Sequence, residues 1–182
     1  MPRLLKRPPR PVSSDRPGGV VPLTKSGMET GELQRHRLGS ILVALQFGLI
    51  IVLGLLAAPV FLGWEASVGA WLLALAGVSL GLWALSANRP GNFNIRPTPR
   101  IDGRLVNDGP YRWIRHPMYT SVAACAGACA WAAASPWGWL AALALAAVLF
   151  TKASFEERWL ALSHPDYETY RTRTRRFLPG LF

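Results

Sequence analysis

Three long apolar runs that contain no charged residue constrain the fold of this chain more than any other feature. They cover residues 38–62, 66–87 and 118–151. At 1.5 Å per residue, the first two are about 37 and 33 Å long as helices, enough to cross a hydrocarbon core of roughly 30 Å. Buried core helices of a soluble protein are the alternative, but two runs this close together leave too little polar chain to cover them. The runs therefore predict membrane-spanning helices.

The third run is too long for a single span, because it would extend about 51 Å as one helix. Ser135-Pro136 lies at its middle. Proline disfavours helix at the preceding residue, so we expect a helical hairpin. We predict an all-α integral membrane protein with four transmembrane helices, of which the third and fourth form this hairpin. The expected spans are residues 38–62, 66–87, 118–135 and 137–151.

The net charge of +10 is distributed around the apolar runs. All twenty Lys and Arg residues lie in residues 1–37, the loop 88–117 and the tail 152–182. The positive-inside rule places these segments, and both termini, in the cytoplasm. Basic chains often bind nucleic acid, but basic residues that flank apolar runs fit membrane topology better, so we expect membrane lipid and no nucleic acid as a partner. The short connections and compact size are typical of a bacterial inner-membrane protein, and the oligomeric state stays open.

Residues 1–37 are rich in proline and bury too little apolar surface to fold alone, so we expect a disordered basic cytoplasmic tail. Residues 38–182 then form one membrane domain. Cys125 and Cys129 are one helical turn apart within an apolar run and are interpreted as packing residues. No other cysteine or histidine cluster accompanies them, so we predict no metal site.

The loop and the tail contain nearly all the groups suited to chemistry. His116-Pro117 is expected to begin the third helix, where unpaired backbone N–H groups and Arg115 attract an anion, either a ligand carboxylate or a lipid phosphate. The tail is predicted to be helical, with Lys152 and Glu156 on one face and Glu157 next to them. Carboxylates this close to an apolar span are costly unless paired or functional, and both interpretations remain open.

These residues form a pattern that resembles a known family. The pattern consists of Leu105-Val106, Gly109-Pro110-Tyr111-Arg112 and Arg115-His116-Pro117-Met118-Tyr119, followed by Glu156-Glu157, Asp166-Tyr167, Tyr170, Arg176 and Pro179. It resembles the signature of the isoprenylcysteine carboxyl methyltransferases, with the phospholipid methyltransferases as more distant relatives. The resemblance covers roughly residues 88–182. It implies that the loop and the helical tail form a cytoplasmic site.

The resemblance implies S-adenosylmethionine as the cofactor. The family positions that contact the cofactor correspond here to Gly103, Arg104, Leu105, Val106, Tyr111, His116, Pro117, Met118, Tyr119 and Glu156. The chemistry of the cofactor adds Arg115, whose guanidinium suits the cofactor carboxylate, and Tyr167, whose ring suits the adenine or the sulfonium. No Gly-x-Gly-x-x-Gly motif follows a strand pattern, so a Rossmann-type cofactor fold is not indicated.

Lys152 and Glu157 are the candidates for the reaction itself. Lys152 stands where the family has an arginine thought to hold the substrate carboxylate, and lysine keeps the charge but lacks the bidentate fork. A carboxylate acceptor needs positioning and no general base. An amine acceptor needs a base, for which Glu157 or His116 is available.

The leading hypothesis is methyl transfer from S-adenosylmethionine to a lipophilic acceptor that enters sideways from the bilayer, in the form of carboxyl O-methylation of an isoprenylcysteine-like substrate. Three alternatives stay open. They are N-methylation of a phospholipid amine, an NADPH-dependent reduction related to that of membrane sterol reductases, and a non-catalytic protein whose basic faces hold anionic lipid.

Overall fold

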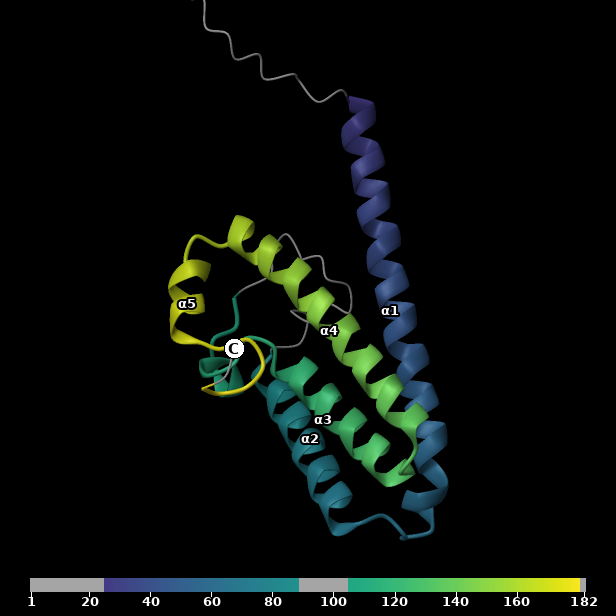
Figure 1. Cartoon of the computed structure of the whole chain (residues 1–182). Coiled ribbons are helices and arrows are strands. Elements are labelled where there is room, and N and C mark those ends of the chain that lie inside the picture. The colour runs from purple at the N-terminus through teal and green to yellow at the C-terminus, as the bar shows by residue number, and fades with distance from the viewer. Residues whose placement is uncertain (1–24, 89–104, 181–182) are drawn as a thin grey trace, which may run out of the picture.

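The computed structural model describes residues 25–88 and 105–180. In this part of the chain, the secondary structure is helical, with no β-strand beyond an isolated bridge between Ile114 and Arg175. The elements are α1 (Lys25–Leu62), α2 (Val68–Ala87), the short 3-10 helix η1 (Gly109–Arg112), α3 (Pro117–Ala133), α4 (Pro136–Ser163) and α5 (Tyr167–Arg173) (Figure 1). The predicted all-α class is confirmed for the described residues.

In the described part of the chain, three helices are long and apolar enough to cross a membrane: residues 37–62 of α1, and the whole of α2 and α4. The third apolar run of the sequence is divided at Ser135-Pro136, since α3 ends at Ala133 and α4 begins at Pro136. With 17 residues, α3 is about 26 Å long, slightly less than the hydrocarbon core. The structure therefore supports three membrane-crossing helices, and the fourth crossing stays a prediction.

Two helices extend beyond the expected spans. The first begins at Lys25 rather than near residue 38, so the segment 25–37 is helical although we expected it in the N-terminal tail. This segment contains no proline, and most of its residues are Lys, Met, Glu, Leu, Gln or Arg, which favour helix. Residues 1–24 of the expected tail lie outside the described residues. At the other end, α4 continues past Thr151 to Ser163 without a break and ends just before His164-Pro165, so the helical tail predicted from the sequence is confirmed there as a continuation of the last span.

Small residues let α3 pack between its neighbours. It contacts α2 on one side and α1 and α4 on the other. A Cβ atom added at Gly77 would lie 2.7 Å from the sulfur of Cys125, and one added at Gly81 would lie 2.6 Å from the hydroxyl of Ser121. The Ser121 hydroxyl also donates a 2.7 Å hydrogen bond to the Gly77 carbonyl. In a lipid bilayer the hydrophobic effect does not drive helices together, because lipid tails are as apolar as the side chains. Close approach through small residues instead stabilises the helix pair by van der Waals contact.

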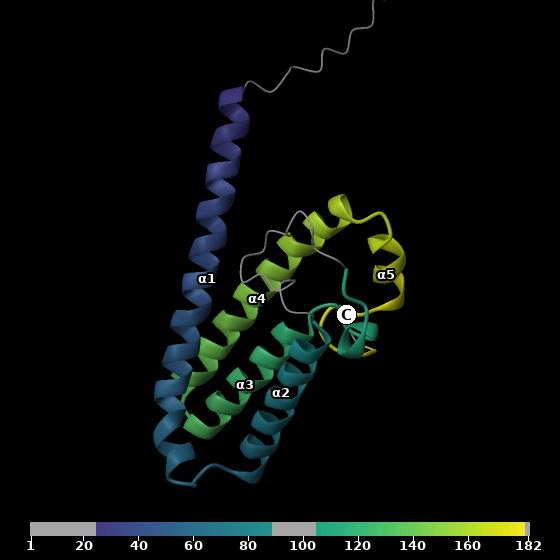
Figure 2. The ribbon, with the colours of Figure 1, turned by 180° about the vertical axis from the view of Figure 1, so that it is seen from behind.

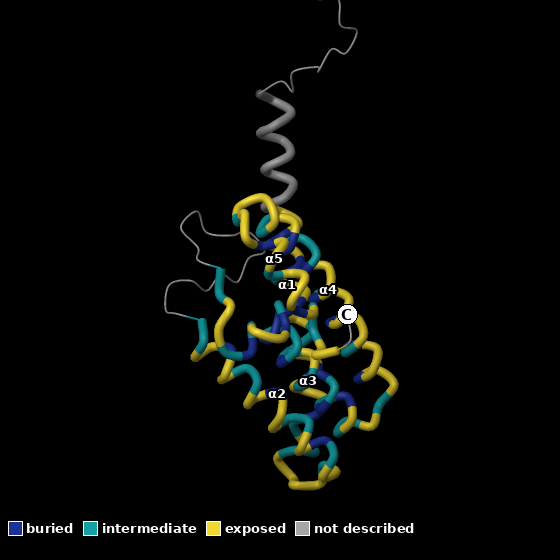
Figure 3. Tube along the Cα trace, turned by 90° about the vertical axis from the view of Figure 1, so that its left-hand side faces the viewer, coloured by how far each residue is buried: buried dark blue, intermediate teal, exposed yellow. Residues whose placement is uncertain are grey.

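The distribution of apolar residues is that of a membrane protein. The interior is a small cluster at the junction of α1, α3 and α4, made of Leu53, Ala126, Ala130, Ala141, Leu145 and Leu149. Large apolar side chains such as Leu55, Leu72 and Leu143 lie on the outside. Figure 3 shows exposed positions along the outer sides of α2 and α4 and buried positions between the helices. An outer surface this apolar indicates contact with lipid.

The chain gathers its polar elements at one end of the bundle. The α1–α2 and α3–α4 turns lie together at the opposite end, while η1, the start of α3, α5 and the C-terminal segment lie beside one another (Figures 1 and 2). The α4 helix leads from the turn end towards these elements. The hairpin arrangement of α3 and α4 thus brings the two motif-bearing segments of the sequence to one place.

Candidate active site

The C-terminal strap, residues 174–177, is bonded to the start of α3. The Arg115 N–H donates to the Arg175 carbonyl at 2.7 Å, and the His116 N–H donates to the Arg176 carbonyl at 3.1 Å. The Thr120 hydroxyl donates to the Phe177 carbonyl at 2.8 Å. The strap therefore satisfies the backbone N–H groups of Arg115 and His116, which we had expected to be available to an anion.

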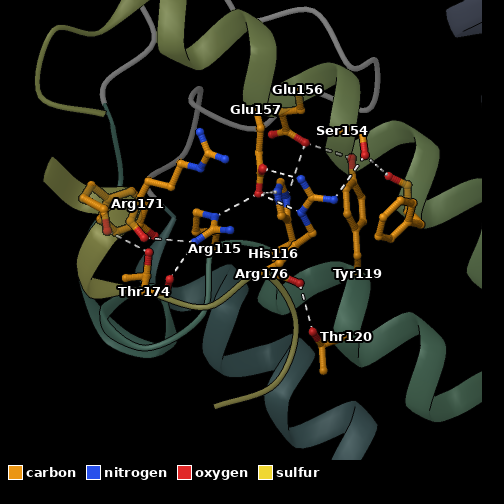
Figure 4. Close-up of polar contacts among 12 residues, drawn as sticks. Arg115, His116, Tyr119, Thr120, Ser154, Glu156, Glu157, Arg171, Thr174 and Arg176 are labelled. Carbon is orange, nitrogen blue, oxygen red and sulfur yellow. Dashed lines mark hydrogen bonds and ion pairs between the residues drawn. The ribbon is translucent and has the colours of Figure 1, made fainter. Parts of the chain in front are cut away.

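Glu157 is the centre of a buried ion cluster. Its Oε1 accepts a hydrogen bond from the Arg115 Nε at 2.8 Å and lies 3.2 Å from the His116 Nε2. Its Oε2 accepts from an Arg176 Nη at 2.6 Å. Only 7% of the Glu157 side chain is exposed, so these partners offset the cost of burying its charge. The Glu157 cluster (Arg115, His116, Glu157 and Arg176) ties the loop, α4 and the strap together, as Figure 4 shows.

Glu156, the neighbouring carboxylate, has a more open environment. Its Oε2 accepts a 3.1 Å hydrogen bond from the Tyr119 hydroxyl and lies 3.7 Å from the His116 Nδ1. The rings of His116 and Tyr119 are stacked with their centroids 5.4 Å apart. About a third of the Glu156 side chain is exposed, at 35% against 7% for Glu157. Glu156 is thus the more accessible carboxylate of the pair.

Three tyrosines enclose this end of the bundle. The Tyr170 hydroxyl donates to the Tyr111 carbonyl at 2.8 Å, which joins α5 to η1. Burial, together with the charge of Glu156, raises the pKa of Tyr111 to about 12, so its ring is neutral at physiological pH. Tyr167 is almost fully buried, and its hydroxyl has no hydrogen-bond partner among the described residues. A buried hydroxyl without a partner indicates a place where a ligand or a water supplies one.

Lys152 lies apart from the Glu157 cluster, one helical turn earlier on α4. Its ammonium is buried, lies 5.4 Å from the centre of the Tyr119 ring, and donates a hydrogen bond to the Oε1 of Gln46 on α1. Tyr119 therefore stands between two polar environments, with Glu156 at its hydroxyl and Lys152 over its ring.

The structure brings most of the predicted site residues to this end of the bundle. Leu105, Val106 and Met118 are partly buried there, and Pro117 is buried in the first turn of α3. Gly103 and Arg104 lie outside the described residues. Sequence reasoning assigned no site role to Arg176 or Gln46. Arg176 was already part of the family pattern, and as a cation in the tail it could have been recognised as a partner for a buried carboxylate. Gln46 could have been recognised as a polar residue within an otherwise apolar run.

With this geometry established, the comparison with known families decides the class. Residues 64–166 match the model of the phospholipid methyltransferase family. The chain belongs to the phospholipid methyltransferase family. Among curated proteins and among solved structures, nothing matches it. The matched range extends from the α1–α2 turn to the turn after α4 and includes His116, Tyr119 and the Glu156-Glu157 pair.

Family membership and the apolar helices together make this protein a membrane methyltransferase, a class that typically takes its methyl group from S-adenosylmethionine and acts on lipid-related substrates. The predicted methyltransferase class and membrane location are therefore confirmed at this level. The match ends before α5 and the strap, so Tyr167 and Arg176 belong to a part of the site that the family match does not cover.

Proposed function

We propose that this protein transfers the methyl group of S-adenosylmethionine to the carboxylate of a lipophilic, isoprenylcysteine-like acceptor. The observation that carries the proposal is the difference in environment between two buried charged groups, Lys152 and Glu157. A buried cation, Lys152, suits an anionic acceptor, while Glu157 has both oxygens engaged by Arg115, His116 and Arg176. Lys152 thus provides a cation that suits a carboxylate acceptor. Glu157 is held by its partners and is therefore not available as the base that an amine acceptor needs.

The residues near Glu156 have the chemistry that the cofactor needs. We assign Glu156 to the amine or a ribose hydroxyl of S-adenosylmethionine, and Tyr167 supplies a buried hydroxyl that has no partner among the described residues. The neutral rings of Tyr111 and Tyr119 suit a sulfonium cation. When bound, the cofactor supplies an electrophilic methyl group. The described residues fit this group, and we further assign to it Gly103, Arg104, Leu105, Val106, Arg115, His116, Pro117 and Met118.

The acceptor carboxylate is itself the nucleophile, so the protein has only to orient it and to exclude water. Transfer of a methyl group from a sulfonium to a carboxylate cancels two opposite charges, which a site of low polarity between helices favours. We propose that Lys152 binds the acceptor carboxylate. Glu157 acts as a positioning residue that holds Arg115 and His116 in place. The lipid part of the acceptor then remains among the apolar helices.

We further propose that α3 is a fourth membrane crossing and that both termini face the cytoplasm of a bacterial inner membrane. The short α3 crosses with little tilt. The proposal is supported by the sequence positions of the described basic residues, which lie outside the apolar runs, with the buried Lys152 directly at the end of one. The acceptor and the cofactor then meet at the cytoplasmic surface.

N-methylation of a phospholipid amine is the second candidate, because the family match favours it. That reaction needs a base, for which His116 or a Glu157 released from its partners would serve. The NADPH-dependent reductase and the non-catalytic lipid binder are outcomes of the same test rather than separate proposals.

The test is a calorimetric titration of the detergent-purified protein with S-adenosylmethionine and with NADPH, followed by transfer of an isotopically labelled methyl group. An N-acetylated S-prenylcysteine and phosphatidylethanolamine serve as acceptors. We expect S-adenosylmethionine to bind and NADPH not to bind. We also expect the labelled methyl group on the prenylcysteine, from which alkali releases it as methanol, because methyl esters are alkali-labile and N-methyl groups are not. Alkali-stable label on phosphatidylethanolamine would establish the second candidate. Binding of NADPH, or of neither ligand, would overturn the methyltransferase proposal.

A further inference from the structure

Gln46 is a polar residue in the middle of an apolar membrane helix, and the mechanism above does not use it. It shares the inward face of α1 with Leu42, Leu53 and Ala57, and only 9% of its surface is exposed. An amide buried within a membrane bundle is costly unless it forms hydrogen bonds. Its position on the packed face of α1 indicates that it was retained for a partner inside the bundle.

That partner is the ammonium of Lys152 on α4. The Lys152 Nζ donates to the Gln46 Oε1 across the α1–α4 interface. An ammonium only donates hydrogen bonds, so the carbonyl end of the amide must face it. The Gln46 NH₂ group is then directed away from Lys152. Among the described residues, the Gln46 side chain forms no other hydrogen bond, so no described group accepts from this NH₂.

The two side chains thus present two kinds of donor side by side. Lys152 offers an ammonium, and Gln46 offers two amide N–H bonds next to it. A carboxylate has two oxygens and is bound best when each oxygen receives its own donor, as in the fork of an arginine. Lysine alone lacks this fork. The Tyr119 ring lies 5.4 Å from the Lys152 ammonium, and its hydroxyl is hydrogen-bonded to Glu156.

We propose that Gln46 and Lys152 together form the headgroup subsite for the acceptor, in which the Gln46 amide donates to one oxygen of the acceptor carboxylate and the Lys152 ammonium to the other. This inference rests on the proposed carboxyl methylation and deepens it, because it adds α1 to the acceptor site. Gln46 also holds the Lys152 side chain in the orientation that the fork requires. The ligand class is a carboxylate attached to an apolar chain.

The experiment compares Gln46→Met and Gln46→Glu with the wild-type protein in nanodiscs. Kinetic constants are measured with an N-acetylated S-prenylcysteine, and the affinity for S-adenosylmethionine is measured by calorimetry. Methionine has the size of glutamine without its donors, so the KM of the acceptor should rise about tenfold or more, the value of one hydrogen bond to a charged group. Glutamate places a competing carboxylate at Lys152, so its KM should rise further. Cofactor affinity should stay within about twofold in both.

Phe47→Leu is the matched control, since Phe47 is adjacent on α1 and exposed on the outer surface. Its KM should equal that of the wild type. An inhibitor with a carboxamide in place of the carboxylate offers one acceptor oxygen, so its inhibition constant should hardly change in Gln46→Met. A merely structural role would instead change cofactor affinity and both ligands together.

The outcomes distinguish failure of the Gln46–Lys152 subsite from failure of the proposed carboxyl methylation. If the wild type methylates the prenylcysteine but Gln46→Met keeps its KM, the subsite is wrong and the proposed function stands. If the wild type neither binds S-adenosylmethionine nor methylates a carboxylate, the proposed function and this inference both fail. Should Gln46→Met not fold, Gln46→Glu still gives Lys152 a hydrogen-bonding oxygen, and an unchanged KM in that variant would overturn the subsite equally.

Discussion

The Glu157 cluster predicts a large loss of stability for the substitution Glu157→Gln. The carboxylate is 7% exposed, and its partners Arg115 and Arg176 are 10% and 21% exposed. Glutamine keeps the shape but removes the charge, so two guanidiniums remain largely buried with no opposing carboxylate. Removing one partner of a buried ion pair costs about 3–5 kcal/mol. At ~2–4 °C per kcal/mol for a chain of this size, the unfolding midpoint should fall by roughly 6–20 °C.

The assay is thermal unfolding of the detergent-purified variants, followed by circular dichroism, with limited proteolysis to detect release of the strap. Glu168→Gln is the matched control, because Glu168 forms a 3.5 Å ion pair with Arg171 in which both side chains are more than half exposed. An exposed pair contributes at most about 1 kcal/mol, so this control should resemble the wild type. Equal midpoints for Glu157→Gln and Glu168→Gln would refute the assignment of the Glu157 cluster as the link between the strap, the loop and α4.

Three further predictions follow from other parts of the structure. Tyr119→Phe keeps the stacked ring but removes the hydroxyl bonded to Glu156, so calorimetry should show S-adenosylmethionine affinity reduced up to about tenfold with an unchanged unfolding midpoint. Gly81→Val places a side chain against the Ser121 hydroxyl, so the unfolding midpoint should drop by the equivalent of about 1–3 kcal/mol, whereas an unchanged midpoint would contradict the close α2–α3 packing. Burial raises the pKa of Tyr111 to about 12, so the stability that this tyrosine contributes is present below pH ~10 and lost as the pH rises through 12. Near-ultraviolet titration of the wild type and of Tyr111→Phe should show a phenolate that forms near pH 12 in the wild type alone. Formation of this phenolate near pH ~10 would contradict the prediction.

The sequence was most informative where a pattern is local. The long runs of uncharged apolar residues predicted the apolar helices, and Ser135-Pro136 predicted where the third run is divided. Both features determine the structure of the same residues in which they occur. The extension of α1 to Lys25 was missed because a basic, glycine-containing segment next to a proline-rich stretch was read by its composition as a tail. The apolar periodicity of a spanning helix gave no signal there.

Long-range pairing was beyond the reach of the pattern. Glu157 was recognised as a candidate, but its saturation by Arg115, His116 and Arg176 depends on how the strap returns to α3. The backbone bonds of the strap determine that return, and any residue except proline can donate them. Gln46 likewise meets Lys152 only through the register of α1 against α4. Its polarity was visible in the sequence, whereas its partner, 106 positions away, was not.

We propose that Glu156, from α4, and the segment around His116 and Tyr119, from the start of α3, face one molecule of S-adenosylmethionine. The most direct measurement is a calorimetric titration of that cofactor into wild-type protein, Glu156→Gln and the control Glu168→Gln. We expect tight binding to the wild type and the control, and no detectable binding to Glu156→Gln, with all three proteins unfolding at similar temperatures. Equal affinity of Glu156→Gln and the wild type would contradict it.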